Sequence, residues 1–144
     1  MDKFNAADMS VWQGRQDPED GELALRWHNK VQPWQADSEP GVVLLGFACD
    51  EGVRRNKGRV GAAAAPLAVR KLLANTAWHL GRPVHDGGDV RCEDGDLDAA
   101  HGRLAERVAE AMSQRDQAQA ALAADPAAWA IPLAKRALPP AWAK

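Results

Sequence analysis

The sequence predicts an α/β domain with a parallel sheet, of which this chain supplies only the beginning. Strand-like and helix-like segments alternate twice between residues 41 and 114, and a βαβα order implies parallel strands. The first strand-like segment, residues 41–50, is one continuous apolar run, as is typical of a strand covered on both faces. Two parallel strands leave an unpaired edge, so the core is expected to be unfinished. The alternative is a small complete domain whose tail helices cover one sheet face.

Residues 1–40 are predicted to form an irregular polar arm. Trp12, Trp27 and Trp34 occur there among few aliphatic residues, and one short helix is expected near Glu22 to Lys30. Large aromatic side chains carry much apolar surface, so these tryptophans are expected to pack on the domain that follows.

The loop of residues 51–61, directly after the first strand, is the candidate functional site. It holds four cations and three glycines, and ligands of open α/β sheets bind at the carboxyl ends of strands. We therefore expect contact with an anionic small molecule through Arg54, Arg55, Asn56 and Arg59. The competing interpretation is a solvated charged loop, or one whose arginines tie the subunits of a homo-oligomer together.

The remaining elements follow in order. Pro66 fits the first turn of a helix running to about Trp78, and a second strand covers residues 83–90. A second helix begins after the acidic residues 93–96 and ends near Gln114. Apolar residues at spacings of three and four predict that one face of this helix packs on the sheet: Leu97, Ala100, Leu104, Val108, Ala111 and Met112. Domain 41–114 then gives way to a divergent tail, 115–144, in which 12 of 30 residues are alanine and no strand is predicted.

Composition excludes several classes of protein. The 144 residues carry 18 basic and 20 acidic side chains, so no overall positive charge favours nucleic acid. No apolar run approaches the roughly 20 residues of a membrane span, and the N-terminus lacks the apolar core of a signal peptide. A cytoplasmic location is expected. Cys49 and Cys92 are expected to be free thiols, because a reducing compartment disfavours disulfides and no evident base lies near Cys49 to activate it.

Five segments carry a resemblance to a known family. They are Trp-Gln-Gly-Arg at 12–15, Arg-Trp-His at 26–28, the run at 44–62, Asn-Thr-Ala-Trp-His at 75–79 and Asp-Gly-Gly-Asp-Val at 86–90. Together they resemble the opening of the formimidoylglutamases, a branch of the arginase/agmatinase ureohydrolases. The resemblance implies the N-terminal portion of an arginase-like three-layer α/β/α fold, whose parallel sheet has eight strands and carries two manganese ions at their carboxyl ends. It also implies hydrolysis of a small molecule, N-formimidoyl-L-glutamate, to L-glutamate and formamide in histidine degradation.

The family's metal motifs are the main departure. The family has Gly-Gly-Gly-His-Glu, then Asp-x-His-x-Asp, then a later Asp-x-Asp, and this sequence does not contain that series. Hydrolysis at an amidine carbon requires a hydroxide that paired metals generate, so we assign no catalytic residue and no metal ligand and expect the chain as written to bind no manganese and to be inactive. The change in composition at Arg115 resembles a frameshift or a truncated reading frame. The alternative is a non-catalytic α/β module that binds a partner or a carboxylate ligand.

Three smaller points remain. Ala65 stands where the family has glycine and would strain the loop if the position requires positive φ. His85 and Asp89 are expected on one strand face beside Asp86, which invites a metal hypothesis, but two intervening glycines favour a bend and a structural role. His28 and His101 are expected to serve ordinary surface or packing roles.

Overall fold

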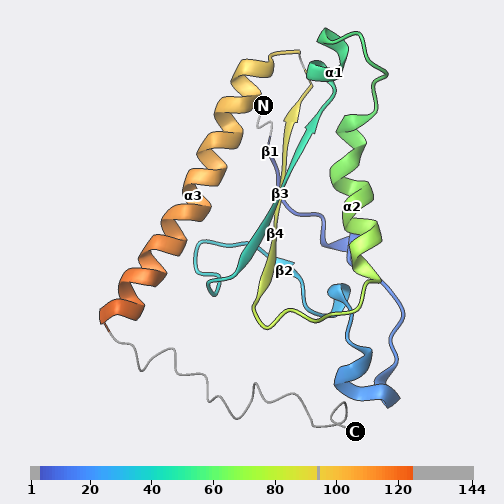
Figure 1. The fold of residues 1–144 in the computed structure, drawn as a ribbon, viewed down its shortest axis with the longest axis vertical. Coiled ribbons are helices and arrows are strands. Elements are labelled where there is room, and N and C mark those ends of the chain that lie inside the picture. Colours follow the sequence, from blue (N-terminus) through green and yellow to red (C-terminus); the bar gives the residue numbers. More distant parts are fainter. Residues whose placement is uncertain (1–3, 94, 125–144) are drawn as a thin grey trace, which may run out of the picture.

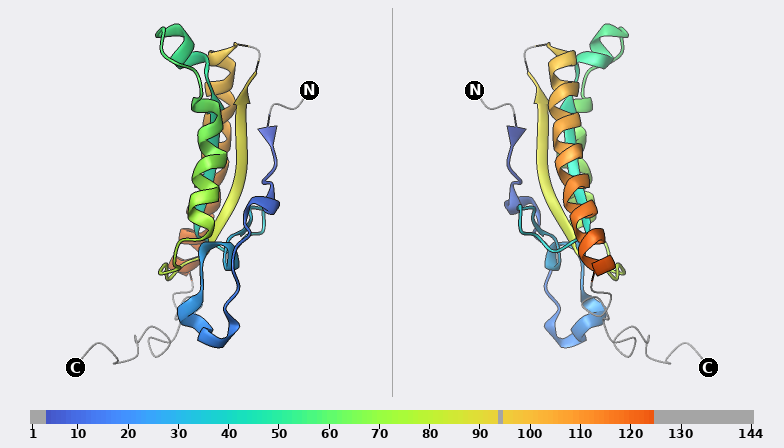
Figure 2. Two further views of the ribbon diagram at one scale, coloured as in Figure 1. Left: turned by 90° about the vertical axis from the view of Figure 1, so that its right-hand side faces the viewer. Right: turned by 90° about the vertical axis from the view of Figure 1, so that its left-hand side faces the viewer.

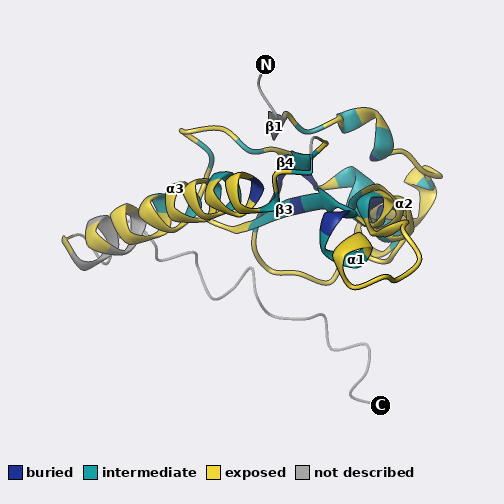
Figure 3. Ribbon diagram, turned by 90° about the horizontal axis from the view of Figure 1, so that it is seen from above, coloured by how far each residue is buried: buried dark blue, intermediate teal, exposed yellow. Residues whose placement is uncertain are grey.

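The computed structural model describes residues 4–93 and 95–124 as a small sheet with a helix on each face (Figures 1 and 3). The main elements are β3 (Val42–Cys49), α1 (Glu51–Arg55), α2 (Ala65–Ala74), β4 (Val84–Cys92) and α3 (Leu97–Ala124). Figure 3 shows α2 and α3 on opposite sides of the β3–β4 pair. The predicted strand, helix, strand, helix order and the three-layer α/β/α arrangement are confirmed.

The sheet is built around β4. β3 runs parallel to β4 from the Val42–Val84 pair to the Cys49–Cys92 pair. Two short strands from the N-terminal arm also pair with β4: β1 (Phe4–Asn5) is antiparallel to it and β2 (Gln32–Pro33) is parallel. Figure 2 shows the arm running beside β4. Within the described residues β3 pairs with β4 alone, so the expected unpaired edge is confirmed, whereas the strands from the arm were not predicted.

The pairing of β3 with β4 is irregular at one point. Leu44 of β3 pairs with Asp86 of β4, and Gly46 pairs with Asp89. β4 therefore has one more residue than β3 between these two pairs, which is a β-bulge. Gly88, at φ 76°, lies inside this bulge, a conformation that glycine adopts at little cost. The extra residue reverses the alternation of faces, so Asp89 shares a face with Asp86. The expectation that Asp89 shares a face with His85 was therefore wrong, and the expected bend is the reason.

The arm contains 3₁₀ helices rather than the predicted α-helix. They are η1 (Met9–Val11), η2 (Pro18–Ala24) and η3 (Trp27–Asn29). Gly21 has φ 59° inside η2, and the backbone at Leu25 and Arg26 is extended, so no continuous helix can form from Glu22 to Lys30. The arm then bridges to the segment after α2, through an isolated pairing of Arg26 with Ala77.

The arm's tryptophans pack on the domain, as predicted. Trp12 is buried with Val31, Ala74 and Val84 in the main apolar cluster. Trp27 packs edge-on against Trp78, with ring centroids 5.5 Å apart. Trp34 donates its indole N–H to the side-chain oxygen of Gln114 at 2.8 Å, and the Arg107 guanidinium lies 4.6 Å above its ring.

The C-terminal ends of α2 and α3 both differ from the predicted ones. α2 ends at Ala74, four residues before Trp78, because the Asn75 and Thr76 amides turn back to Leu73 and the chain then pairs with the arm. α3 continues through the predicted boundary at Gln114 to Ala124, since the glutamines and alanines of that stretch are good helix formers. The rest of the predicted tail, 125–144, lies outside the described residues.

The sheet-facing side of α3 is slightly rotated from the predicted one. Leu97, Ala100, Leu104 and Ala111 are at least half-buried, whereas Val108 and Met112 are 41% and 46% exposed. Ala65, by contrast, has ordinary helical angles of φ −60° and ψ −43°, so the strain expected there does not arise. The positive φ angles in this loop belong to Lys57, at 55°, and Gly61, at 144°. No helix within 4–93 or 95–124 combines the length and apolarity needed to cross a bilayer.

Candidate functional site

The candidate loop begins with a short helix, which the sequence did not predict. α1 covers Glu51–Arg55, and Lys57, at φ 55°, ends it by letting the Gly58 amide donate to the Val53 carbonyl at 2.9 Å. Asp50, the residue before α1, accepts hydrogen bonds from the Gly61 amide at 2.8 Å and the Ala63 amide at 3.0 Å. The hydrogen bonds from these two amides lower the pKa of Asp50, and the one from Ala63 has the larger effect. The loop is therefore closed on itself at the carboxyl end of β3.

Glu51 organises two of the predicted arginines. Its carboxylate accepts from Arg54 Nε and Nη2 at 2.7 Å each and from Arg55 Nε at 2.8 Å. Glu51 is 7% exposed, and the Arg54 and then the Arg55 hydrogen bonds lower its pKa to about 2. Arg55 also donates from Nη2 to the Gly95 carbonyl at 3.2 Å, which ties α1 to the start of α3. These guanidiniums therefore have internal partners, which the sequence analysis did not foresee.

The four predicted contact residues lie in one segment but differ in their surroundings. The side chains of Arg54 and Arg55 remain 67% and 48% exposed around Glu51. Asn56 caps the end of α1 and is exposed, and Arg59 is exposed in the loop beyond. Glu51 therefore brings Arg54 and Arg55 together, whereas Asn56 and Arg59 are near them only in the sequence. Exposed guanidiniums are groups that can match a carboxylate.

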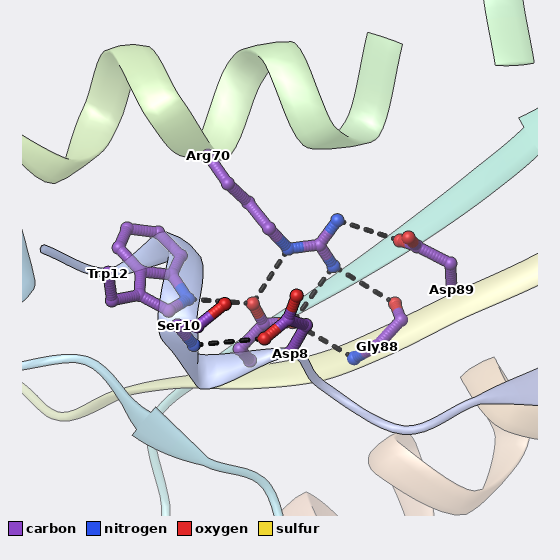
Figure 4. Close-up of polar contacts among 7 residues, drawn as sticks. Asp8, Ser10, Trp12, Arg70, Gly88 and Asp89 are labelled. Atoms are coloured by element: carbon purple, nitrogen blue, oxygen red, sulfur yellow. Dashed lines mark hydrogen bonds and ion pairs between the residues drawn. The ribbon is translucent and has the colours of Figure 1, made fainter. Parts of the chain in front are cut away.

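A second polar cluster, the Arg70 network, lies under the middle of the sheet (Figure 4). Arg70 donates from Nε and Nη2 to the two oxygens of Asp86 at 2.7 and 2.8 Å, and from Nη1 to Asp89 at 2.7 Å. Asp86 is fully buried and also accepts from the Trp12 indole N–H at 2.8 Å and the Gly88 amide at 2.9 Å. Burial works to lower the pKa of Arg70, but the hydrogen bonds that Arg70 donates to Asp86 and Asp89 outweigh it, and the pKa is raised. This network locks α2, β4 and the arm together.

The histidines have structural surroundings, as expected. His85 is buried and its Nε2 lies 2.8 Å from the Glu39 carbonyl, away from the two carboxylates held by Arg70. His28 Nε2 lies 3.1 Å from the Arg15 carbonyl, and the His101 ring packs against Phe47 with centroids 5.4 Å apart.

The described residues do not fit a metal pair. No group of three or more His, Cys, Asp or Glu side chains within 4–93 and 95–124 could hold a metal ion. Asp86 and Asp89 both form ion pairs with Arg70, so this guanidinium occupies the space between the two carboxylates. We therefore derive no metal-dependent step from these residues.

A groove of about 410 Å³ follows the unpaired side of β3. It is lined by β3 and by one side of α2, through Val43, Leu44, Leu45, Gly46, Phe47, Ala65, Pro66, Val69, Arg70 and Leu73. The sheet edge, the two flanking helices and the loop at the strand ends define part of a doubly wound α/β domain, with the candidate loop at the carboxyl edge.

Comparison with known proteins places this domain in a family. The model of the arginase family matches residues 40–122, and the chain belongs to that family. It is 83% identical over 116 residues to the formimidoylglutamase of Aeromonas hydrophila subsp. hydrophila, which covers 79% of this chain and 37% of that protein. The corresponding figures are 74% over 116 residues for the formimidoylglutamase of Aeromonas salmonicida (79% and 37%) and 59% over 111 residues for that of Photobacterium profundum (77% and 30%). The chain thus spans about a third of the length of these relatives.

Proposed function

We propose that this chain is the N-terminal part of a formimidoylglutamase, which hydrolyses N-formimidoyl-L-glutamate to L-glutamate and formamide. The observation that carries the proposal is the 83% identity over 116 residues to a protein of that name. Because the match covers 79% of this chain and 37% of that relative, the matched residues correspond to one portion of the relative. In this proposal they supply the first strands and the substrate-side loop and do not turn over substrate by themselves.

The loop 51–61 provides the substrate contacts in this proposal. The substrate carries two carboxylates, and Arg54, Arg55, Asn56 and Arg59 present cations and an amide at the carboxyl end of β3. Glu51 holds Arg54 and Arg55 in place, so these two side chains lose less rotamer freedom when a carboxylate binds. Among the described residues no carboxylate supports Arg59 in this way, so Arg59 is the best candidate for a contact that forms only with substrate.

Two manganese ions are proposed for the complete enzyme, where they would supply hydroxide at neutral pH. Their ligands would come from sequence outside the described residues, since no group of three or more His, Cys, Asp or Glu side chains within those residues could hold a metal ion. A cytoplasmic location is also proposed, and the free thiols of Cys49 and Cys92 are consistent with it.

A chimaera tests the proposal. Residues 1–114 of this chain would replace the matching part of the Aeromonas hydrophila enzyme, and formamide release from N-formimidoyl-L-glutamate would be measured with manganese present. We expect turnover by the chimaera and none by residues 1–144 alone. Loss of activity in a folded chimaera, or turnover by residues 1–144 alone, would contradict the proposal; the former would favour the non-catalytic binding module.

The substrate contacts are tested in the same chimaera. Arg59→Ala is expected to raise KM by roughly 10-fold or more, because a charge-assisted hydrogen bond contributes about 1.5–3 kcal/mol. Arg82→Ala removes an exposed cation at the opposite end of the sheet and is the matched control. An unchanged KM in Arg59→Ala would show that Arg59 does not bind substrate.

A further inference from the structure

The two cysteines of this chain lie side by side at the ends of neighbouring strands. Cys49 is the last residue of β3, Cys92 is the last residue of β4, and the two are direct partners in the parallel register. Neighbouring strands lie about 4.8 Å apart, which falls within the Cα separation of roughly 4.4–6.8 Å that a disulfide requires. Partnered residues also point to the same face of a sheet. The backbone therefore already has the spacing for a bridge between them.

The two thiols are free and close enough to influence each other. Both side chains are half-buried, so a small reagent can reach them. Burial raises the pKa of Cys92, and the adjacent Cys49 thiol raises it further, while Arg103 acts in the opposite direction. The effect of the Cys49 thiol on Cys92 agrees with the strand register, which places the two residues side by side.

We propose that Cys49 and Cys92 form a reversible dithiol–disulfide site whose oxidant is a low-molecular-weight disulfide. The site is separate from the proposed hydrolase function and does not depend on it. It also does not use the loop arginines or the Arg70 network.

The chemistry balances in two exchange steps. The thiolate of one cysteine attacks the small disulfide, forming a mixed disulfide and releasing one small thiolate. The thiolate of the other cysteine then attacks the protein sulfur of that mixed disulfide, forming the Cys49–Cys92 bond and releasing the second small thiolate. Each released thiolate takes up one of the two protons that the protein thiols lost. Two protein thiols are oxidised and one small disulfide is reduced to two thiols.

The bridge would act on the loop that follows β3. It would tie the carboxyl ends of β3 and β4 together one residue before Asp50, whose carboxylate closes the loop 51–61. It would also close a long chain segment, which restricts the unfolded state. The oxidised chain is therefore expected to melt about 10 °C above the reduced chain.

Intact mass measurement tests the proposal directly. The reduced chain is incubated with glutathione disulfide under native conditions, and in parallel in urea, and then analysed by intact mass and peptide mapping. We expect the native chain to lose two hydrogens and to carry no glutathione, with the Cys49 and Cys92 peptides joined. In urea, where the strands no longer hold the sulfurs together, glutathione adducts are expected to accumulate.

Single variants supply the control. Cys49→Ser and Cys92→Ser should each retain one glutathione, because the second exchange has no thiol to complete it. The wild-type result remains decisive if a variant does not fold. Two stable glutathione adducts on the native wild-type chain, or no reaction under native conditions, would overturn the proposal.

Discussion

Removing Arg70 should cost more stability than removing any exposed arginine of this chain. Arg70→Ala leaves the fully buried Asp86 carboxylate without the two hydrogen bonds from the guanidinium, and it leaves Asp89 without its ion pair. Removing one partner of a buried ion pair typically costs about 3–5 kcal/mol. Asp86 retains its bonds from the Trp12 indole and the Gly88 amide, so we expect a loss near the lower end of that range.

Urea unfolding of the chain, followed by tryptophan fluorescence and circular dichroism, measures this loss. Arg70→Lys retains the charge but cannot bond both Asp86 oxygens in the same fork, so we expect a smaller loss of about 1–3 kcal/mol. Arg70→Lys also gives a measurable value if Arg70→Ala is unfolded without urea. Arg82→Ala is the exposed control and should remain within about 0.5 kcal/mol of wild type. A loss below about 1 kcal/mol for a folded Arg70→Ala, with an unchanged urea dependence, would refute the assigned role of the network.

Two further predictions use the same unfolding assay. The pKa of Glu51 is lowered from 4.5 to about 2, so its ionised form stabilises the fold above pH 4.5 and this contribution is lost as the pH falls toward 2. The stability difference between wild type and Glu51→Gln should therefore shrink over that window, and a difference independent of pH would contradict the assignment. Gly46→Ala should destabilise the fold by about 1–3 kcal/mol, because the new Cβ would overlap the Asp89 carboxylate and lie 2.8 Å from Pro66 Cβ. Gly52→Ala, with open space around its Cβ, is the matched control and should be neutral or stabilising; equal effects of the two changes would refute the packing argument.

The order of elements was predictable because it depends on local patterns. The apolar run at 42–49 and the apolar spacing after residue 96 each reflect how a single element packs on its neighbours. Both elements, β3 and α3, begin where they were expected. The helix ends were less predictable. α3 passes Gln114 without interruption because a change in composition that retains good helix formers does not end a helix.

The candidate site was only partly predictable, since its geometry depends on contacts between distant residues. The position of the loop at the carboxyl end of β3 followed from the strand assignment alone. The pairing of Arg54 and Arg55 with Glu51 has a local signal, because acid and base lie three and four residues apart on a helix, but that signal needs α1 to be recognised first. The Arg70–Asp86 pair has no comparable signal, because it joins a helix to a strand 16 residues later through a bulge.

Burial in the two long strands is the reverse of what their composition suggests. β3 is almost entirely apolar, yet within it only Gly46 is fully buried, whereas β4 contains two aspartates and a histidine and is buried over most of its length. β4 is covered because β3 pairs with one side of it and the arm with the other, and Arg70 forms ion pairs with Asp86 and Asp89. β3 has the composition of a central strand but, within the described residues, has a neighbour on one side only. An apolar strand beside an open groove is what the first third of a longer parallel sheet should expose, and this agrees with a chain that covers 37% of its Aeromonas hydrophila relative.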